Sequence, residues 1–326
     1  MDYDIISSIE QRTSSFLNND QMKKLHLILI GHLSDANITK NNENAPSDIE
    51  LINSFISAKH VEGCSIRTLN YYQTTMKNVL NGIAKPIKQI VTNDIRIYLA
   101  EYQNKNKISK VTIDNVRRIL SSFFSWLEDE DHIIKSPVRR IKKVKVAKIV
   151  KDVYSDESLE LMRDGCETLR DLAIVDLLSS TGMRVGELVN LNREDIDFQN
   201  RECVVTGKGD KERLVYFDAR TKVHLSNYLN SREDVNSSLF VSLLKPHRRL
   251  QISGVESRLK QIGLDLNMIK VHPHKFRRTL ATRAIDKGMP IEQVQRLLGH
   301  QKIDTTLEYA MVNQANVKIS HTKYIC

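Results

Sequence analysis

The chain has 326 residues, 40% of them hydrophobic, and carries 49 lysines and arginines against 40 aspartates and glutamates. This length suits two domains with real cores, and the basic excess indicates an acidic partner, nucleic acid first. Its four cysteines form no CxxC pair, which argues against a cysteine-based zinc site or a disulfide framework and fits a reducing cytoplasm. No apolar run approaches the roughly 20 residues of a membrane span, and the acidic start MDYDIISSIE does not resemble a signal peptide.

Helical patterns dominate the first part of the chain. Residues 1–45 are predicted to form an N-terminal helical extension and an Asn-, Ser- and Pro-containing linker. Residues 46–137 contain four helical segments, which predict a compact all-α bundle. The first three segments can be capped by Ser47 and Asp48, by Ser65, and by Thr92 or Asn93, and the fourth is expected to begin at Ser109 or Lys110.

A basic segment follows the bundle. VRRIKKVKVAKIVK, residues 138–151, contains no acidic residue. Two interpretations remain open: a solvated interdomain linker over 138–154, or a linker that also lies along a phosphate backbone and releases its counterions. The second interpretation predicts that its basic side chains bind DNA, namely Arg139, Arg140, Lys142, Lys143 and Lys145.

Residues 155–326 are predicted to form a second, mainly helical domain with a C-terminal tail. The stretch RECVVTGKGDKERLVYFD has two β-rich runs around a glycine-containing turn, which predicts an antiparallel hairpin. SLFVS, residues 238–242, is a candidate third strand. Helices are then expected in HKFRRTLATRAIDKG, PIEQVQRLLG and DTTLEYAMVNQ, with Asp304 capping the last.

Several polar side chains of this second domain have ordinary explanations when each is considered alone. Arg184 could pair with Glu187 on the surface, and Lys208 could be a solubilising residue of a polar hairpin. His300 could be a helix-end cap, and Tyr309 a core aromatic. The pair His272 and His274 could suggest a metal, although no acidic or cysteine ligand stands nearby in the sequence.

Considered together, the same residue types suit the cleavage of a phosphodiester without metal. Arginines match the charge and geometry of the non-bridging oxygens, lysine can protonate a leaving oxygen, and histidine can move a proton. A tyrosine can act as the nucleophile, but its reference pKa near 10 makes such neighbours necessary. The six candidates are Arg184, Lys208, His274, Arg277, His300 and Tyr309.

These residues stand in motifs that resemble those of the tyrosine recombinase, or phage integrase, family, and of its Xer-like members in particular. TGMRVGELVNL resembles the first-arginine box, GKGDKERLV the hairpin lysine motif, and HKFR the His-x-x-Arg box. LLGH and DTTLEY resemble the last two motifs. Family members commonly have Leu and His on either side of the second arginine, where Phe276 and Arg278 stand here. The motif match covers residues 155–312, and over 46–137 it is a looser match of helical pattern.

The resemblance implies a DNA breaking-rejoining fold: a helical core-binding domain that clamps duplex DNA together with an α-rich catalytic domain containing a small antiparallel sheet. It further implies site-specific recombination by a tetramer on two DNA sites, through a 3′-phosphotyrosyl enzyme and a Holliday junction, with no cofactor, metal or ATP. Alternatives from other classes are a type IB topoisomerase, a non-catalytic DNA-binding regulator and, less favoured, a zinc hydrolase using His272 and His274.

Overall fold

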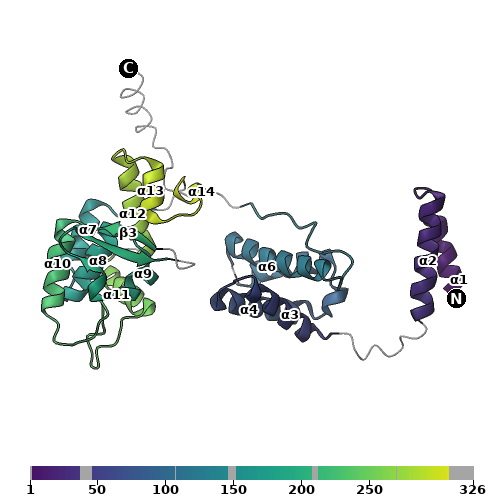
Figure 1. Cartoon of the computed structure of the whole chain (residues 1–326), viewed down its shortest axis with the longest axis horizontal. Helices are drawn as coiled ribbons and strands as arrows, with labels where there is room; N and C mark the ends of the chain where they lie inside the picture. Colours follow the sequence, from purple (N-terminus) through teal and green to yellow (C-terminus); the bar gives the residue numbers. More distant parts are fainter. Residues whose placement is uncertain are drawn as a thin grey trace, which may run out of the picture. The chain divides into compact units, whose positions relative to one another are not determined.

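The computed structural model of the chain describes residues 2–36, 46–106, 108–145, 152–207, 212–268 and 270–307. The described part is mainly helical with one small antiparallel sheet (Figure 1), which confirms the predicted fold class. The chain divides into two compact units, Met1–Lys148 and Ile149–Cys326. The large apolar core clusters each fall within one unit.

The first unit is all-helical in its described part. Its N-terminal helices α1 and α2 pack against each other, while α3, α4, α5 and α6 share one apolar core. Phe55 lies at the centre of that core, with the rings of Phe123 at 5.2 Å, Trp126 at 5.7 Å and Tyr72 at 5.9 Å. The elements are α1 (Asp2–Thr13), α2 (Asn19–Ala36), α3 (Asp48–Val61), α4 (Ile66–Ile83), the 3-10 turn η1 (Ile87–Gln89), α5 (Thr92–Asn106) and α6 (Lys110–Asp129).

Three helix starts predicted from the sequence have serine caps. The hydroxyls of Ser47, Ser65 and Ser109 each accept a hydrogen bond from the backbone N–H three residues later, at the starts of α3, α4 and α6. Each such bond satisfies a donor that a helix start otherwise leaves without a partner. Thr92 behaves differently, since it is the first residue of α5 and its hydroxyl donates to the carbonyl of Pro137 at 2.7 Å.

The first part of the basic segment, residues 138–145, packs against the helical bundle. Val138 is buried in the core, and Ile141 and Val144, at spacings of three, pack against the same cluster. The N–H of Val144 donates to the buried carboxylate of Asp114 on α6 at 3.0 Å. The intervening basic residues are therefore turned toward solvent, while residues 146–151 lie outside the described part.

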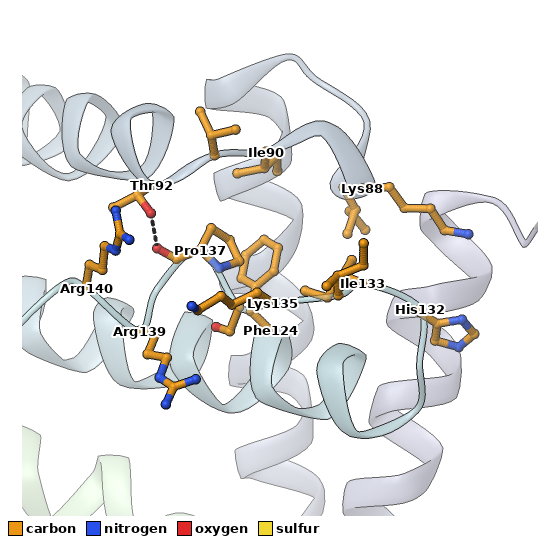
Figure 2. A pocket seen from close by; sticks show the side chains of 14 residues that line it. Lys88, Ile90, Thr92, Phe124, His132, Ile133, Lys135, Pro137, Arg139 and Arg140 are labelled. Atoms are coloured by element: carbon orange, nitrogen blue, oxygen red, sulfur yellow. Dashed lines mark hydrogen bonds between the residues drawn. The ribbon is translucent and has the colours of Figure 1, made fainter. Parts of the chain in front are cut away.

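A hollow of about 530 Å³ lies beside this segment, between its start and the turn before α5. Figure 2 shows its apolar lining, which includes Ile90, Phe124 and Pro137, and the hydrogen bond from Thr92 to Pro137. Arg139 and Arg140 extend away from Phe124 in this view. The apolar side chains thus anchor the segment, and its cations stay exposed at the edge of the bundle.

The second unit surrounds helix α8, most of whose apolar side chains are buried. α8 packs against α7, α10, α11 and α12. The elements are α7 (Asp156–Asp164), α8 (Leu169–Thr181), α9 (Val185–Asn190), the 3-10 turn η2 (Arg193–Asp195), β1 (Ile196–Asp197), β2 (Glu202–Thr206), β3 (Glu212–Tyr216), α10 (Ala219–Asn230), α11 (Ile252–Asp265), α12 (Pro273–Asp286), α13 (Ile291–Leu298) and α14 (Ile303–Leu307).

The sheet contains the predicted hairpin, but its third strand is not the predicted one. β2 pairs antiparallel with β3, with Thr206 opposite Glu212 and Cys203 opposite Val215. The other neighbour of β2 is β1, Ile196–Asp197. Ser238 and Val241 of the expected third strand form only isolated bridges, to Asn192 and Arg249. The prediction of a strand of this sheet at 238–242 is therefore wrong.

Candidate active site

Side chains from several elements of the candidate site converge on the C-terminal end of α13. α13 ends at Gly299, whose φ of 65° is left-handed. Three successive carbonyls at this end accept hydrogen bonds from arginines of three other elements: Leu297 from Arg213 on β3 at 3.2 Å, Leu298 from Arg277 on α12, and Gly299 from Arg184 before α9 at 3.3 Å. The last carbonyls of a helix lack partners within it and carry its negative dipole end. They therefore attract guanidinium groups.

Arg277 is the most deeply buried of these arginines, with 3% of its surface exposed. Besides Leu298 it donates to the carbonyl of Gly182 at 2.8 Å, at the end of α8. Gly182 has a left-handed φ of 61°, and a Cβ there would stand 2.6 Å from Leu280 on α12. Glycine thus lets α8 end close enough to α12 for this bond to form. Arg278, the neighbouring arginine, instead donates to the carbonyl of Asp152 at 2.8 Å.

Arg184 does form the ion pair with Glu187 that the sequence suggested as its ordinary explanation. Its Nη1 lies 2.7 Å from Glu187 Oε1, and its backbone N–H donates to Oε2 at 2.7 Å. This is no surface pair, however, because Glu187 is 4% exposed and also accepts two 2.7 Å bonds from Arg213. Burial acts to raise the pKa of Glu187, but the hydrogen bonds from Arg213 and Arg184 hold it below its ordinary value.

His300 follows directly after this helix end. Its backbone N–H donates to the carbonyl of Gln295 at 3.1 Å, and its ring Nδ1 is hydrogen-bonded to the hydroxyl of buried Thr306 on α14 at 2.9 Å. Burial, and then the positive charges of Arg277, Arg184 and Arg213, lower the pKa of His300 to about 4. The imidazole is therefore neutral at pH 7 and able to accept a proton.

His274 lies in the first turn of α12 and is exposed, one helical turn before Arg277. His272 precedes that helix, and burial, then Arg278, His274 and Lys275, lower its pKa. Within the described ranges, no group of three or more His, Cys, Asp or Glu side chains is arranged to hold a metal ion. His272 and His274 therefore gain no metal-binding partner there.

Lys208 and Tyr309, the remaining two candidates, lie outside the described residues. Their described neighbours in the sequence reach the site: Arg213 on β3 contacts Glu187 and Leu297, and Thr306 on α14 contacts His300. The structure thus brings together Arg184, Arg277 and His300. The catalytic roles of all six candidates stay predictions.

Sequence reasoning did not find Arg213 and underrated Glu187. Arg213 looks like one charged residue in the short strand ERLVY, and its partners are 26 and 84 positions away. The available signal was weak: an arginine five positions after Lys208, on the second strand of the predicted hairpin.

Comparisons with known proteins identify the family of the chain. A family model described as the phage integrase family matches residues 148–316, and one described as phage integrase, N-terminal SAM-like domain, matches residues 51–134. Tyrosine recombinase XerC from Staphylococcus aureus (strain N315) is 30% identical over 277 residues, covering 81% of this chain and 93% of that protein.

Solved structures share the fold. XerH site-specific recombinase bound to a palindromic difH substrate, in a post-cleavage complex, matches with a TM-score of 0.67 at 19% identity, covering 97% of this chain and 94% of that one. A lambda integrase dimer bound to a COC′ core site matches with a TM-score of 0.69 at 17% identity, covering 89% of this chain and 85% of that one.

The fold and the site define a DNA breaking and rejoining enzyme. More narrowly, the chain belongs to the phage integrase family, the tyrosine recombinases, which are site-specific DNA recombinases. Within the described part of the chain, no helix is both long and apolar enough to cross a bilayer.

The environment of His300 leads to a testable titration. We expect its Cε1–H resonance to titrate near pH 4 by NMR, with His300→Gln used to assign the signal. Because the unfolded chain protonates this group below its ordinary pKa of 6.5 and the folded chain only below about 4, the free energy of unfolding should fall as pH drops through this window. Arg184→Gln removes a positive neighbour and should raise the pKa of His300. A wild-type titration near 6.5, or a pKa unmoved in Arg184→Gln, would contradict this account.

Proposed function

We propose that this recombinase cleaves duplex DNA by attack of the Tyr309 hydroxyl on a backbone phosphate, assisted by Arg184, Arg277, His300, His274 and Lys208. The observation that carries the proposal is the convergence of Arg184, Arg277 and neutral His300 on the end of α13. Its partner is double-stranded DNA containing specific recombination sites.

The chemistry follows from the charge of the transition state. Attack by the phenolate oxygen gives a pentacoordinate phosphorus with added negative charge on the non-bridging oxygens, which the two guanidiniums can bind. Their positions are fixed before substrate arrives, since each donates to main-chain carbonyls of the site. Preorganised donors of this kind are each worth about 10²–10³ in rate.

Proton movements complete the step. The Tyr309 proton passes to a neutral histidine, and His300 is neutral at pH 7. A scissile phosphate beside the arginines would offset their positive charge and so raise the basicity of His300. The P–O5′ bond breaks as the new P–O bond forms, and Lys208 gives a proton to the departing 5′ oxygen. The products are a 3′-phosphotyrosyl enzyme and a free 5′-hydroxyl. Attack by the 5′-hydroxyl of the partner strand reverses the step, so no ATP is consumed.

We assign the parts of the chain as follows. Residues 155–326 form the catalytic domain with its tail, 46–137 a core-binding domain, 138–154 the linker and 1–45 an N-terminal extension. Recombination by this route requires a tetramer on two DNA sites and a Holliday-junction intermediate. The 30% identity with XerC supports an Xer-type resolvase in the cytoplasm, and the integrase or excisionase of a mobile element is the other form that the family takes.

Removal of the nucleophile tests the function directly. On a nicked suicide substrate, the wild-type protein should form a covalent protein–DNA adduct visible on a denaturing gel. Tyr309→Phe should form none, because it lacks the attacking oxygen, while its affinity for the site changes by less than about twofold. Tyr216→Phe, at a tyrosine exposed on β3, serves as the matched control and should form the adduct normally. An adduct that persists in Tyr309→Phe would move the nucleophile elsewhere.

The role of Lys208 as the acid is tested by changing the leaving group. Lys208→Ala should slow cleavage about 10²–10⁴-fold, as loss of a general acid does. A 5′-bridging phosphorothiolate should restore the rate, because sulfur departs without a proton. Lys211→Ala, in the same predicted turn, is the control and should cleave ordinary DNA at nearly the wild-type rate. Failure of the sulfur substrate to rescue Lys208→Ala assigns the protonation to another group.

The exposed cations of the basic segment predict a salt effect. Replacing Arg139, Arg140, Lys142 and Lys143 by Gln should reduce the slope of log affinity against log salt by up to about 3.6, since each phosphate contact contributes about 0.9 to the slope. The matched control exchanges lysine and arginine at the same four positions and should keep the slope, because the charge is preserved. An unchanged slope in the Gln variant would show that these side chains do not contact phosphates and that the segment is only an interdomain linker.

A further inference from the structure

Arg213 joins three parts of the catalytic unit that are distant in sequence. Its two terminal nitrogens bind both oxygens of Glu187 on α9, and its Nε donates to the carbonyl of Leu297 at the end of α13. Its own backbone belongs to β3, the second strand of the β2–β3 hairpin. The side chain is 13% exposed, so these contacts are made away from bulk water.

The approach between Arg213 and the end of α13 is close. A Cβ placed on Gly299 would stand 2.8 Å from Cδ of Arg213 and 3.1 Å from its Nε. Glycine at 299 therefore serves two requirements, the left-handed turn after α13 and the room for this arginine. The residue after this glycine is His300, so a shift of Arg213 would reach the histidine through a single peptide unit.

The electrostatics of Glu187 explain why a second arginine is needed. A buried carboxylate that faced Arg184 alone would cancel its charge and hold it in a tight pair. Arg213 occupies both carboxylate oxygens in fork geometry, which is the stronger pairing. The trio of Arg184, Arg213 and Glu187 then carries a net charge of +1, two guanidiniums less one carboxylate. Arg184 keeps its charge available for a phosphate.

We propose that Arg213 is a positioning residue of the recombinase. By binding Glu187 and the end of α13, it fixes the positions of Arg184, His300 and the β2–β3 hairpin relative to one another. It acts through these groups and does not itself touch DNA. The inference rests on the proposed function, since the arrangement that it maintains is the one that would bind the scissile phosphate.

The experiment measures single-turnover cleavage of the nicked substrate at saturating protein. Arg213→Met should lower the cleavage rate about 100-fold, the loss expected when catalytic groups move by about 1 Å. The dissociation constant for DNA should change less than about twofold, because no phosphate contact is removed. Arg213→Lys keeps the charge but not the fork, and should fall between Arg213→Met and the wild type.

The double variant Arg213→Met with Glu187→Gln separates positioning from direct contact. In Arg213→Met the carboxylate of Glu187 stays buried without its Arg213 partner, and such a buried charge is costly. Glu187→Gln removes that charge, so the double variant should cleave about tenfold or more faster than Arg213→Met alone. A group that bound substrate directly would not be rescued in this way. Arg232→Met is the matched control: Arg232 is 4% exposed, pairs with Asp234 and donates to the carbonyls of Ser238 and Leu239, and its loss should spare the cleavage rate of folded protein.

Failure of the positioning role of Arg213 can be distinguished from failure of the proposed cleavage function. If the wild type forms no adduct at all, the proposed function fails. If the wild type cleaves and folded Arg213→Met cleaves equally well, or loses DNA affinity in proportion to rate, only the positioning role fails. A thermal melt establishes that each variant is folded, and Arg213→Lys keeps the test decisive if Arg213→Met does not fold. No rescue by Glu187→Gln likewise overturns the positioning role.

Discussion

The hydrogen bonds between guanidinium groups and the last carbonyls of α13 are the interaction on which the catalytic unit depends. A helix end leaves its final carbonyls without partners, and here they are satisfied by arginines from β3, α12 and the turn before α9. Gathering like charges is unfavourable by itself. The carbonyl dipoles and the buried carboxylate of Glu187 offset that repulsion, and the excess of positive charge that remains is what an anionic phosphate requires.

The same arrangement sets the protonation state of the site. His300 is held by Thr306 and stands among cations, so burial and nearby charge both favour its neutral form. The charge cluster thus keeps His300 neutral while its arginines retain permanent positive charge and fixed hydrogen-bond donors. Both properties suit the phosphoryl chemistry that we propose.

The first unit shows how a basic segment can be both anchored and available. Val138, Ile141 and Val144 recur at every third position and pack on the bundle, and Asp114 on α6 holds the segment by a main-chain hydrogen bond. The cations between them cannot follow into the apolar core, because burial of an unpaired charge is costly. Packing therefore keeps them exposed to solvent. Anchoring of the segment would lower the conformational entropy lost if, as we propose, these cations bind a phosphate backbone.

Local chemistry explains what the sequence alone determined. The caps at Ser47, Ser65 and Ser109 and the β2–β3 hairpin each depend on residues close together in the sequence. The motif pattern likewise indicated the family and named the candidate residues. The structure alone revealed that β1 and not 238–242 completes the sheet, that Thr92 bonds Pro137, and that Glu187 is buried between Arg184 and Arg213. Thr92 and Pro137 are 45 positions apart and Glu187 and Arg213 are 26 apart, so these contacts depend on which segments the packed core brings together. β1 is close to β2 in the sequence, but its two residues are too few to carry a strand pattern.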